Sequence, residues 1–203
     1  IRKFTPHEFF FQKNELNYQP IIALLPGSRK QEVLNMLNRM VSLVKEFPNA
    51  QFVIAGVDSL PESIYAPAKA AGIKIVLNQT YDLLSHATAA VVTSGTATLE
   101  TALFRVPQIV VYRTSGISYR IAKGLIRVPF ISLPNLIAGK EVVKELIQDD
   151  FSVENLKKEL QKIFSNVVYK GEMLQGYDLI REKIGEQSAS ETTANLILDS
   201  LKE

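Results

Sequence analysis

The chain has 203 residues, of which 46% are hydrophobic, with a formal net charge of +2 and no cysteine. This length is ample for one α/β domain with a hydrophobic core. The near-neutral charge argues against a nucleic-acid-binding protein, and the lack of cysteine excludes disulfides and thiolate metal sites. With only His7 and His86 present, we expect no metal site, and no apolar run approaches the length of about 18 residues of a membrane-spanning helix.

The amino-terminal residues 1–19 carry Phe4, Phe9, Phe10 and Phe11 among polar side chains. We interpret 1–19 as a linker from a missing amino-terminal domain, whose aromatic side chains face that domain. A chain that begins at Ile1 rather than at methionine agrees with this interpretation. The alternative is that these aromatic residues cover the same domain as the rest of the chain.

The next part of the chain alternates short apolar runs with stretches of helical periodicity. Strands are predicted at 21–25, 51–55, 73–77, 89–92 and 108–112, with helices at 28–47, 59–71, 81–87 and 96–104. Ser28 with Gln31, and Ser59 with Glu62, match capping boxes that would begin the first two helices. This alternation predicts an α/β fold with a doubly wound, Rossmann-like parallel sheet. Ligands of such sheets bind beyond the carboxyl ends of the strands, where the strand order reverses.

The stretch 93–100, Thr-Ser-Gly-Thr-Ala-Thr-Leu-Glu, joins a buried strand to a helix. The first helical turn has free N–H groups and favours negative charge, and the hydroxyls of Ser94, Thr96 and Thr98 can donate to phosphate oxygens. Gly95 would let a ligand approach the backbone, and Glu100 is an acceptor suited to a ribose diol. The alternative is an ordinary strand-to-helix turn capped by serine and threonine.

A second turn of this kind, Pro-Gly-Ser-Arg at 26–29, follows the first predicted strand. Gly27 permits a tight turn, Ser28 begins the helix, and Arg29 could make paired hydrogen bonds to a phosphate. The alternative is a solvated surface arginine. Because both turns follow strand carboxyl ends, they can converge on one ligand, and two anion sites suit a diphosphate better than a single phosphate.

The remaining segments offer less chemistry. Residues 113–128 predict a basic amphipathic helix with Arg120, Lys123 and Arg127 on one face, which could lie on an anionic membrane surface or simply face solvent. Asn135 lies between a strand-like run and a stretch at 136–148 that is predicted to be helical. Three further helices are predicted after residue 150, the last at 194–201, with a polar joint at 185–190.

Three motifs occur in order, at 24–32, 94–100 and 132–140, and together they resemble the carboxyl-terminal half of the lipid A disaccharide synthase family. The similarity extends from about residue 20 to 201. It implies the carboxyl-terminal domain of a GT-B glycosyltransferase, with extra helices at the end. It also implies transfer of 2,3-diacylglucosamine from UDP to 2,3-diacylglucosamine 1-phosphate, without metal or cofactor, at the cytoplasmic face of a Gram-negative inner membrane.

The resemblance assigns roles to individual residues. The diphosphate would be held by Gly27, Ser28 and Arg29 and by the run Ser94, Gly95, Thr96, Ala97 and Thr98. Glu100 would hold the ribose, and Thr80 and Tyr81 would meet the uracil. Arg29 and Asn135 would stabilise the leaving group at the donor site.

The expected organisation is a linker at 1–19, a UDP-sugar-binding domain at 20–150 and a helical extension at 151–203. The acceptor site and general base would belong to the missing half, so we expect this chain to bind UDP without turnover. Residues 186–203 would dock elsewhere or exchange between chains of a homo-oligomer. The alternatives are another UDP-sugar transferase or epimerase of the same fold, and a non-catalytic module that binds nucleotide or membrane.

Overall fold

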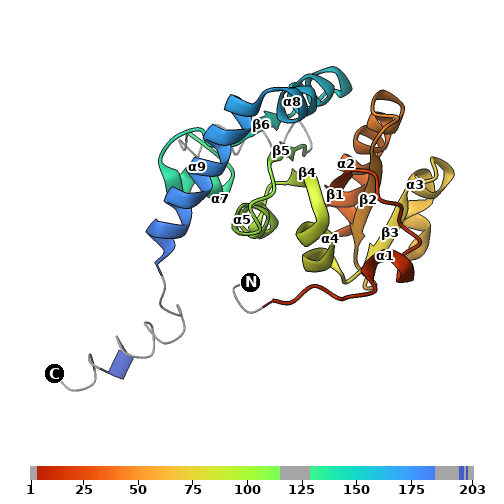
Figure 1. Ribbon diagram of the computed structural model, residues 1–203, viewed down its shortest axis with the longest axis horizontal. Coiled ribbons are helices and arrows are strands. Elements are labelled where there is room, and N and C mark those ends of the chain that lie inside the picture. The colour runs from red at the N-terminus through yellow and green to blue at the C-terminus, as the bar shows by residue number, and fades with distance from the viewer. Residues whose placement is uncertain (1–3, 115–128, 186–196, 199, 201–203) are drawn as a thin grey trace.

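The computed structural model describes residues 4–114, 129–185, 197, 198 and 200, and it contains one six-stranded parallel sheet (Figure 1). The strand order is β3-β2-β1-β4-β5-β6. The strands are β1 (Ile21–Leu25), β2 (Gln51–Gly56), β3 (Lys74–Leu77), β4 (Ala87–Thr93), β5 (Gln108–Tyr112) and β6 (Lys144–Ile147). All five residues of β1 are buried, as expected for a central strand covered on both faces. The predicted doubly wound α/β fold is confirmed.

Helices connect the strands and cover both faces of the sheet. They are α1 (Phe10–Lys13), α2 (Lys30–Ser42), α3 (Ala66–Ala70), α4 (Thr80–His86), α5 (Thr96–Leu103), α7 (Leu133–Ala138), α8 (Val153–Ser165) and α9 (Val167–Ile184). Two 3-10 turns, η1 (Leu43–Glu46) and η2 (Glu62–Tyr65), follow α2 and precede α3.

Alternate residues of β1 enter two separate apolar clusters, one on each face of the sheet. Ile22 and Leu24 pack with residues of α2, α3, α8 and α9. Ile21, Ala23 and Leu25 pack with residues of α1 and α4 on the opposite face. The sheet is therefore the middle layer of three.

Both predicted capping boxes are wrong. The N-cap of α2 is Arg29, and Glu32 rather than Gln31 accepts hydrogen bonds from the backbone at the start of the helix. At the second site, Pro61 is the cap of a 3-10 turn, and the α-helix begins only at Ala66. Pro61 and Pro67 lack an N–H group, so this segment forms two short pieces instead of one helix from residue 59.

The amino-terminal segment, described from Phe4 onward, packs on this domain. Phe10 is fully buried and stacks on His86, the last residue of α4. The Phe4 ring contacts the rings of Tyr81 and Phe104 edge to face, with centroids 5.5 and 5.8 Å apart. These aromatic side chains therefore cover the second face of the sheet, which is the alternative that the sequence left open.

The carboxyl-terminal helices also belong to the main core, so the expected boundary between 20–150 and 151–203 does not separate two cores. Leu156 and Leu160 of α8, and Met173 and Tyr177 of α9, share the apolar cluster of the sheet. The predicted helices at 113–128 and 194–201 and the joint at 185–190 lie almost wholly outside the described residues. Within the described part of the chain, no helix has the length and apolar character needed to cross a bilayer.

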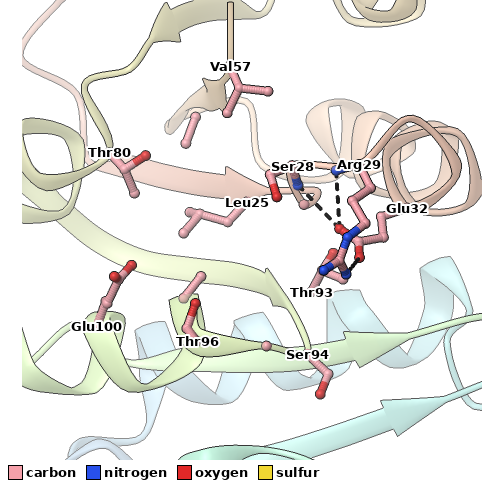
Figure 2. Close-up of a pocket in the computed structure, with 14 residues that line it drawn as sticks. Leu25, Ser28, Arg29, Glu32, Val57, Thr80, Thr93, Ser94, Thr96 and Glu100 are labelled. Atoms are coloured by element: carbon pink, nitrogen blue, oxygen red, sulfur yellow. Dashed lines mark hydrogen bonds and ion pairs between the residues drawn. The ribbon is translucent and has the colours of Figure 1, made fainter. Parts of the chain in front are cut away.

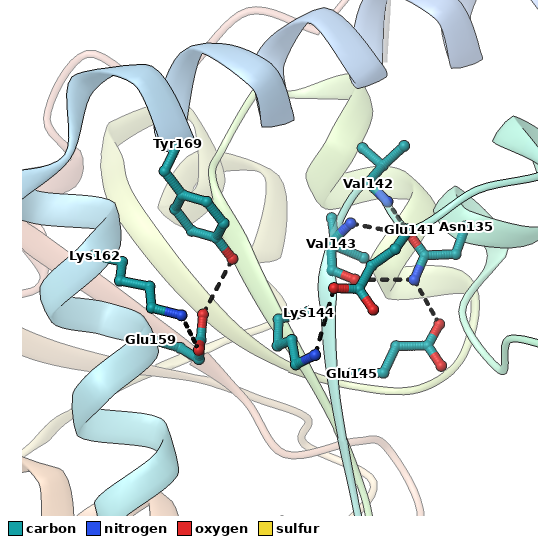
Figure 3. Close-up of polar contacts among 9 residues, drawn as sticks. All are labelled: Asn135, Glu141, Val142, Val143, Lys144, Glu145, Glu159, Lys162 and Tyr169. Carbon is teal, nitrogen blue, oxygen red and sulfur yellow. Dashed lines mark hydrogen bonds and ion pairs between the residues drawn. The ribbon is translucent and has the colours of Figure 1, made fainter.

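The predicted helix at 136–148 is also wrong, because α7 ends at Ala138 and strand β6 follows. Gly139 takes a left-handed conformation (φ 75°) that ends the helix. The fully buried Asn135 then closes the turn into β6 (Figure 3). Its Oδ1 accepts from the N–H groups of Val142 (2.7 Å) and Val143 (2.9 Å), and its Nδ2 donates to Val143 O (2.9 Å) and to Glu145 Oε1 (2.8 Å).

We predict that Asn135→Ala lowers the free energy of unfolding by about 2–4 kcal/mol, because it leaves buried N–H groups without acceptors. Urea denaturation measures this difference. Asn38→Ala on the exposed side of α2 removes the same amide and should change stability by less than about 0.5 kcal/mol. Equal effects of the two substitutions would contradict the structural role of Asn135.

Candidate functional site

A cavity of about 430 Å³ lies at the carboxyl ends of β1 and β4, between the first turns of α2 and α5 (Figure 2). It is the place where the strand order reverses, because β1 pairs with β2 on one side and with β4 on the other. Its lining residues are Leu25, Gly27, Ser28, Arg29, Glu32, Ala55, Val57, Thr80, Thr93, Ser94, Gly95, Thr96, Ala97 and Glu100. Both turns singled out in the sequence therefore border the same cavity.

The α5 side of the cavity presents free backbone donors. Thr96 and Ala97 are the first two residues of the helix, where N–H groups have no intrahelical acceptor, and the described residues supply no other acceptor for them. In contrast, the Thr98 N–H is bonded to Gly95 O at 3.2 Å, and the Ser94 N–H is bonded to Val111 O at 2.9 Å. Two adjacent N–H groups at a helix start form a site for an anion.

The α2 side of the cavity is different, because Glu32 already accepts its backbone donors. Glu32 Oε2 lies 3.3 Å from both Ser28 N and Arg29 N, and Oε1 lies 2.9 Å from Arg29 Nη1. Gly27 makes this arrangement possible, since its φ is +105° and an added Cβ would lie 2.6 Å from Glu32 Oε2. The arginine side chain remains 83% exposed, so its guanidinium can move toward a ligand.

Glu100 is linked to Tyr81 on the far wall of the cavity. The Tyr81 hydroxyl donates to Glu100 Oε1 at 3.1 Å. Burial raises the pKa of Tyr81, and the nearby Glu100 carboxylate adds to the effect. Tyr81 therefore stays protonated at neutral pH and holds one carboxylate oxygen of Glu100, while the other is left for a ligand.

Most of the predicted site residues border the cavity, but three do not. Tyr81 acts only through Glu100. Thr98 is fully buried, and its hydroxyl donates to Gly95 O at 2.7 Å rather than toward the cavity. Asn135 is fully buried in the turn before β6 and uses its amide there. Thr98 and Asn135 therefore do not line the cavity, because nearby backbone groups and, for Asn135, the Glu145 carboxylate take up their polar atoms.

Sequence reasoning missed two polar residues of the cavity, Glu32 and Thr93. Glu32 occupies the third helical position, where a carboxylate often accepts from the cap, and this signal was present in the sequence. Thr93 is the last residue of β4 and only 5% exposed, and its Oγ1 has no hydrogen-bond partner among the described residues. A polar side chain at the end of a buried strand was the available signal for Thr93.

Solved structures share this fold at low sequence identity. The chain superposes on sucrose-phosphate synthase from Thermosynechococcus elongatus with a TM-score of 0.61 at 13% identity, covering 98% of this chain and 50% of that one. It superposes on a UDP co-structure of S. aureus MnaA with a TM-score of 0.60 at 13% identity, covering 100% and 50%. A UDP-GlcNAc 2-epimerase from Neisseria meningitidis, solved with UDP-GlcNAc, gives 0.56 at 16% identity, covering 93% and 47%. These neighbours show a Rossmann-like fold of the GT-B type.

Sequence relatives are more similar. The chain is 34% identical over 188 residues to the lipid-A-disaccharide synthase of Geobacter sulfurreducens, covering 89% of this chain and 49% of that protein. It is 38% identical over 189 residues to the synthase of Syntrophus aciditrophicus, with the same coverage. The chain thus spans about half the length of these relatives. Residues 3–197 match the family model described as lipid-A-disaccharide synthetase, and the chain therefore belongs to this family of glycosyltransferases.

Proposed function

We propose that this chain is the donor-binding half of a lipid A disaccharide synthase. It binds UDP-2,3-diacylglucosamine, and in the whole enzyme the 2,3-diacylglucosamine passes to 2,3-diacylglucosamine 1-phosphate with release of UDP. The observation that carries the proposal is the convergence of the turns after β1 and β4 on one cavity. The UDP and UDP-GlcNAc named for two structural neighbours support a uridine diphosphate as the ligand.

A donor-binding half would stabilise UDP as it leaves the sugar. Negative charge gathers on the diphosphate as the glycosidic bond breaks, so donors fixed near it stabilise the transition state more than the ground state. The N–H groups of Thr96 and Ala97 are fixed by α5, and the exposed guanidinium of Arg29 can swing from Glu32 to the phosphate. These groups would stabilise the departing UDP without a metal or cofactor.

The nucleoside would lie along the rest of the cavity. Glu100, held by the Tyr81 hydroxyl, has an oxygen available to accept from the ribose hydroxyls. Leu25, Val57 and Thr80 line the wall beyond it and offer an apolar surface with one hydroxyl for the uracil ring.

Other parts of the reaction are proposed to lie outside this chain. Because the chain spans about half the length of its relatives, the acceptor site and the general base would come from the other half. We place the reaction at the cytoplasmic face of the inner membrane, where both lipid substrates would be reached, and propose contacts between copies through the carboxyl-terminal residues.

We predict that this chain binds UDP and that Arg29→Ala weakens the binding at least about tenfold, the equivalent of roughly 1.4 kcal/mol. Arg29 is the one cation that lines the cavity within the described part of the chain. Titration calorimetry measures both affinities. Lys30→Ala removes the neighbouring cation, which does not line the cavity, and should change the affinity less than about twofold. Unchanged affinity of the Arg29 variant would remove this residue from the site.

A negative charge at the α5 anion site should weaken UDP binding without harming the fold. Thr96 is exposed at the first helical position, so Thr96→Asp suits the helix dipole and should keep or slightly raise the melting temperature. Its carboxylate would repel the diphosphate, and we expect UDP affinity to fall more than about tenfold. The neutral Thr96→Asn variant should bind nearly as well as the original chain. Equal affinity of the aspartate and asparagine variants would place the diphosphate elsewhere.

We predict that the chain alone, supplied with both lipid substrates, forms no disaccharide although it binds UDP. A radiolabelled acceptor assay with a full-length synthase as the positive control tests this. Turnover by the 203-residue chain would show that the acceptor site and general base lie within it.

A further inference from the structure

Among the residues that the structure describes, the cavity is poor in positive charge for a site that is proposed to hold a diphosphate. The ionisable residues of this described lining are one cation, Arg29, and two carboxylates, Glu32 and Glu100. Arg29 is paired with Glu32 at 2.9 Å, so its charge is already matched. The favourable field for an anion comes mainly from the first turn of α5, and it has to compete with carboxylates on the other walls.

Glu32 is held in the position that an anion would otherwise take at the start of α2. Its Oε2 is shared between the N–H groups of Ser28 and Arg29, and its Oε1 faces the guanidinium. The space beside Gly27 is filled by the same side chain, with an added Cβ lying 2.8 Å from Glu32 Cβ. The carboxylate is only 30% exposed, so solvent screens it incompletely.

We infer that Glu32 determines the charge that the cavity accepts, and that it selects a diphosphate ester over a diphosphate with a free terminal phosphate. The inference deepens the proposed function and rests on it. A nucleotide sugar has an ester at its outer phosphate, whereas free UDP carries up to about one more negative charge there, since the second pKa of a phosphate is near 6. The carboxylate of Glu32 repels this added charge. The product UDP is therefore bound less tightly than its phosphate contacts alone would allow.

Thr93 supports a ligand close to Glu32. Its hydroxyl is buried in the cavity lining and has no partner among the described residues, so it can donate to whichever anion comes within reach. If the guanidinium of Arg29 turns to the ligand, the Glu32 carboxylate loses one hydrogen-bond donor. The Thr93 hydroxyl is another donor that lines the same cavity.

The test compares two probes, UDP and the methyl ester of its terminal phosphate, by titration calorimetry at pH 7.5. The ester removes the extra charge without adding a sugar. We expect Glu32→Gln, which keeps an acceptor for the two N–H groups, to raise the affinity for UDP about fivefold more than the affinity for the ester, as one charge removed near 4 Å in a water-like dielectric would do. Glu172→Gln, which removes an exposed carboxylate on α9 outside this cavity, should leave the ratio unchanged.

The outcomes separate the two proposals. If the unmodified chain binds neither probe, the proposed nucleotide site fails and this inference fails with it. If both probes bind and Glu32→Gln changes the two affinities equally, the nucleotide site stands and the inference is overturned. If Glu32→Gln does not fold, Glu32→Asp keeps the charge with a shorter reach, and it should preserve the preference for the ester although both affinities change. Loss of that preference in the aspartate variant would also overturn the inference.

Discussion

The reversal of strand order between β1 and β4 is the constraint on which the site depends. β1 is hydrogen-bonded to β2 on one edge and to β4 on the other, and the chain leaves β1 and β4 in turns that lead to two different helices. A cavity lies between the first turns of α2 and α5, at the carboxyl ends of these two strands. Both turns border that space because the strands end at the same edge.

The turns that begin α2 and α5 differ in whether their backbone N–H groups are free to bind an anion. At α5 the first N–H groups have no acceptor among the described residues, whereas at α2 the equivalent donors are occupied by the carboxylate of Glu32. The first turn of α5 can therefore accept an anion, whereas the N–H groups at the start of α2 already have the Glu32 carboxylate as their acceptor. Arg29 can serve either partner. Its guanidinium contacts Glu32, but its side chain remains largely in solvent and can turn toward an anion in the cavity.

The sequence predicted the central strands and the meeting of the two turns because buried parallel strands are continuous apolar runs. It could not predict β6, whose four residues include Lys144 and Glu145 and lie at the edge of the sheet, where side chains are half exposed. Ligand contacts were also expected for Thr98, from its hydroxyl at the helix start, and for Asn135, from the family resemblance. In the structure, Thr98 bonds to a nearby backbone carbonyl, and Asn135 bonds to nearby backbone groups and to Glu145, partners that depend on the local path of the chain. Glu32 was different, because a carboxylate at the third helical position is a signal that the sequence already carried.

The strand order also bears on how the protein is made. β1 obtains its first neighbour when β2 is synthesised, but its other edge pairs with residues 87–93, which emerge from the ribosome much later. Until then the most apolar strand of the domain carries an open row of backbone donors and acceptors. Such an edge is prone to pair with other chains, and non-local parallel pairing forms slowly. Between the synthesis of Leu25 and that of Thr93, a nascent chain therefore has this apolar edge without its native partner.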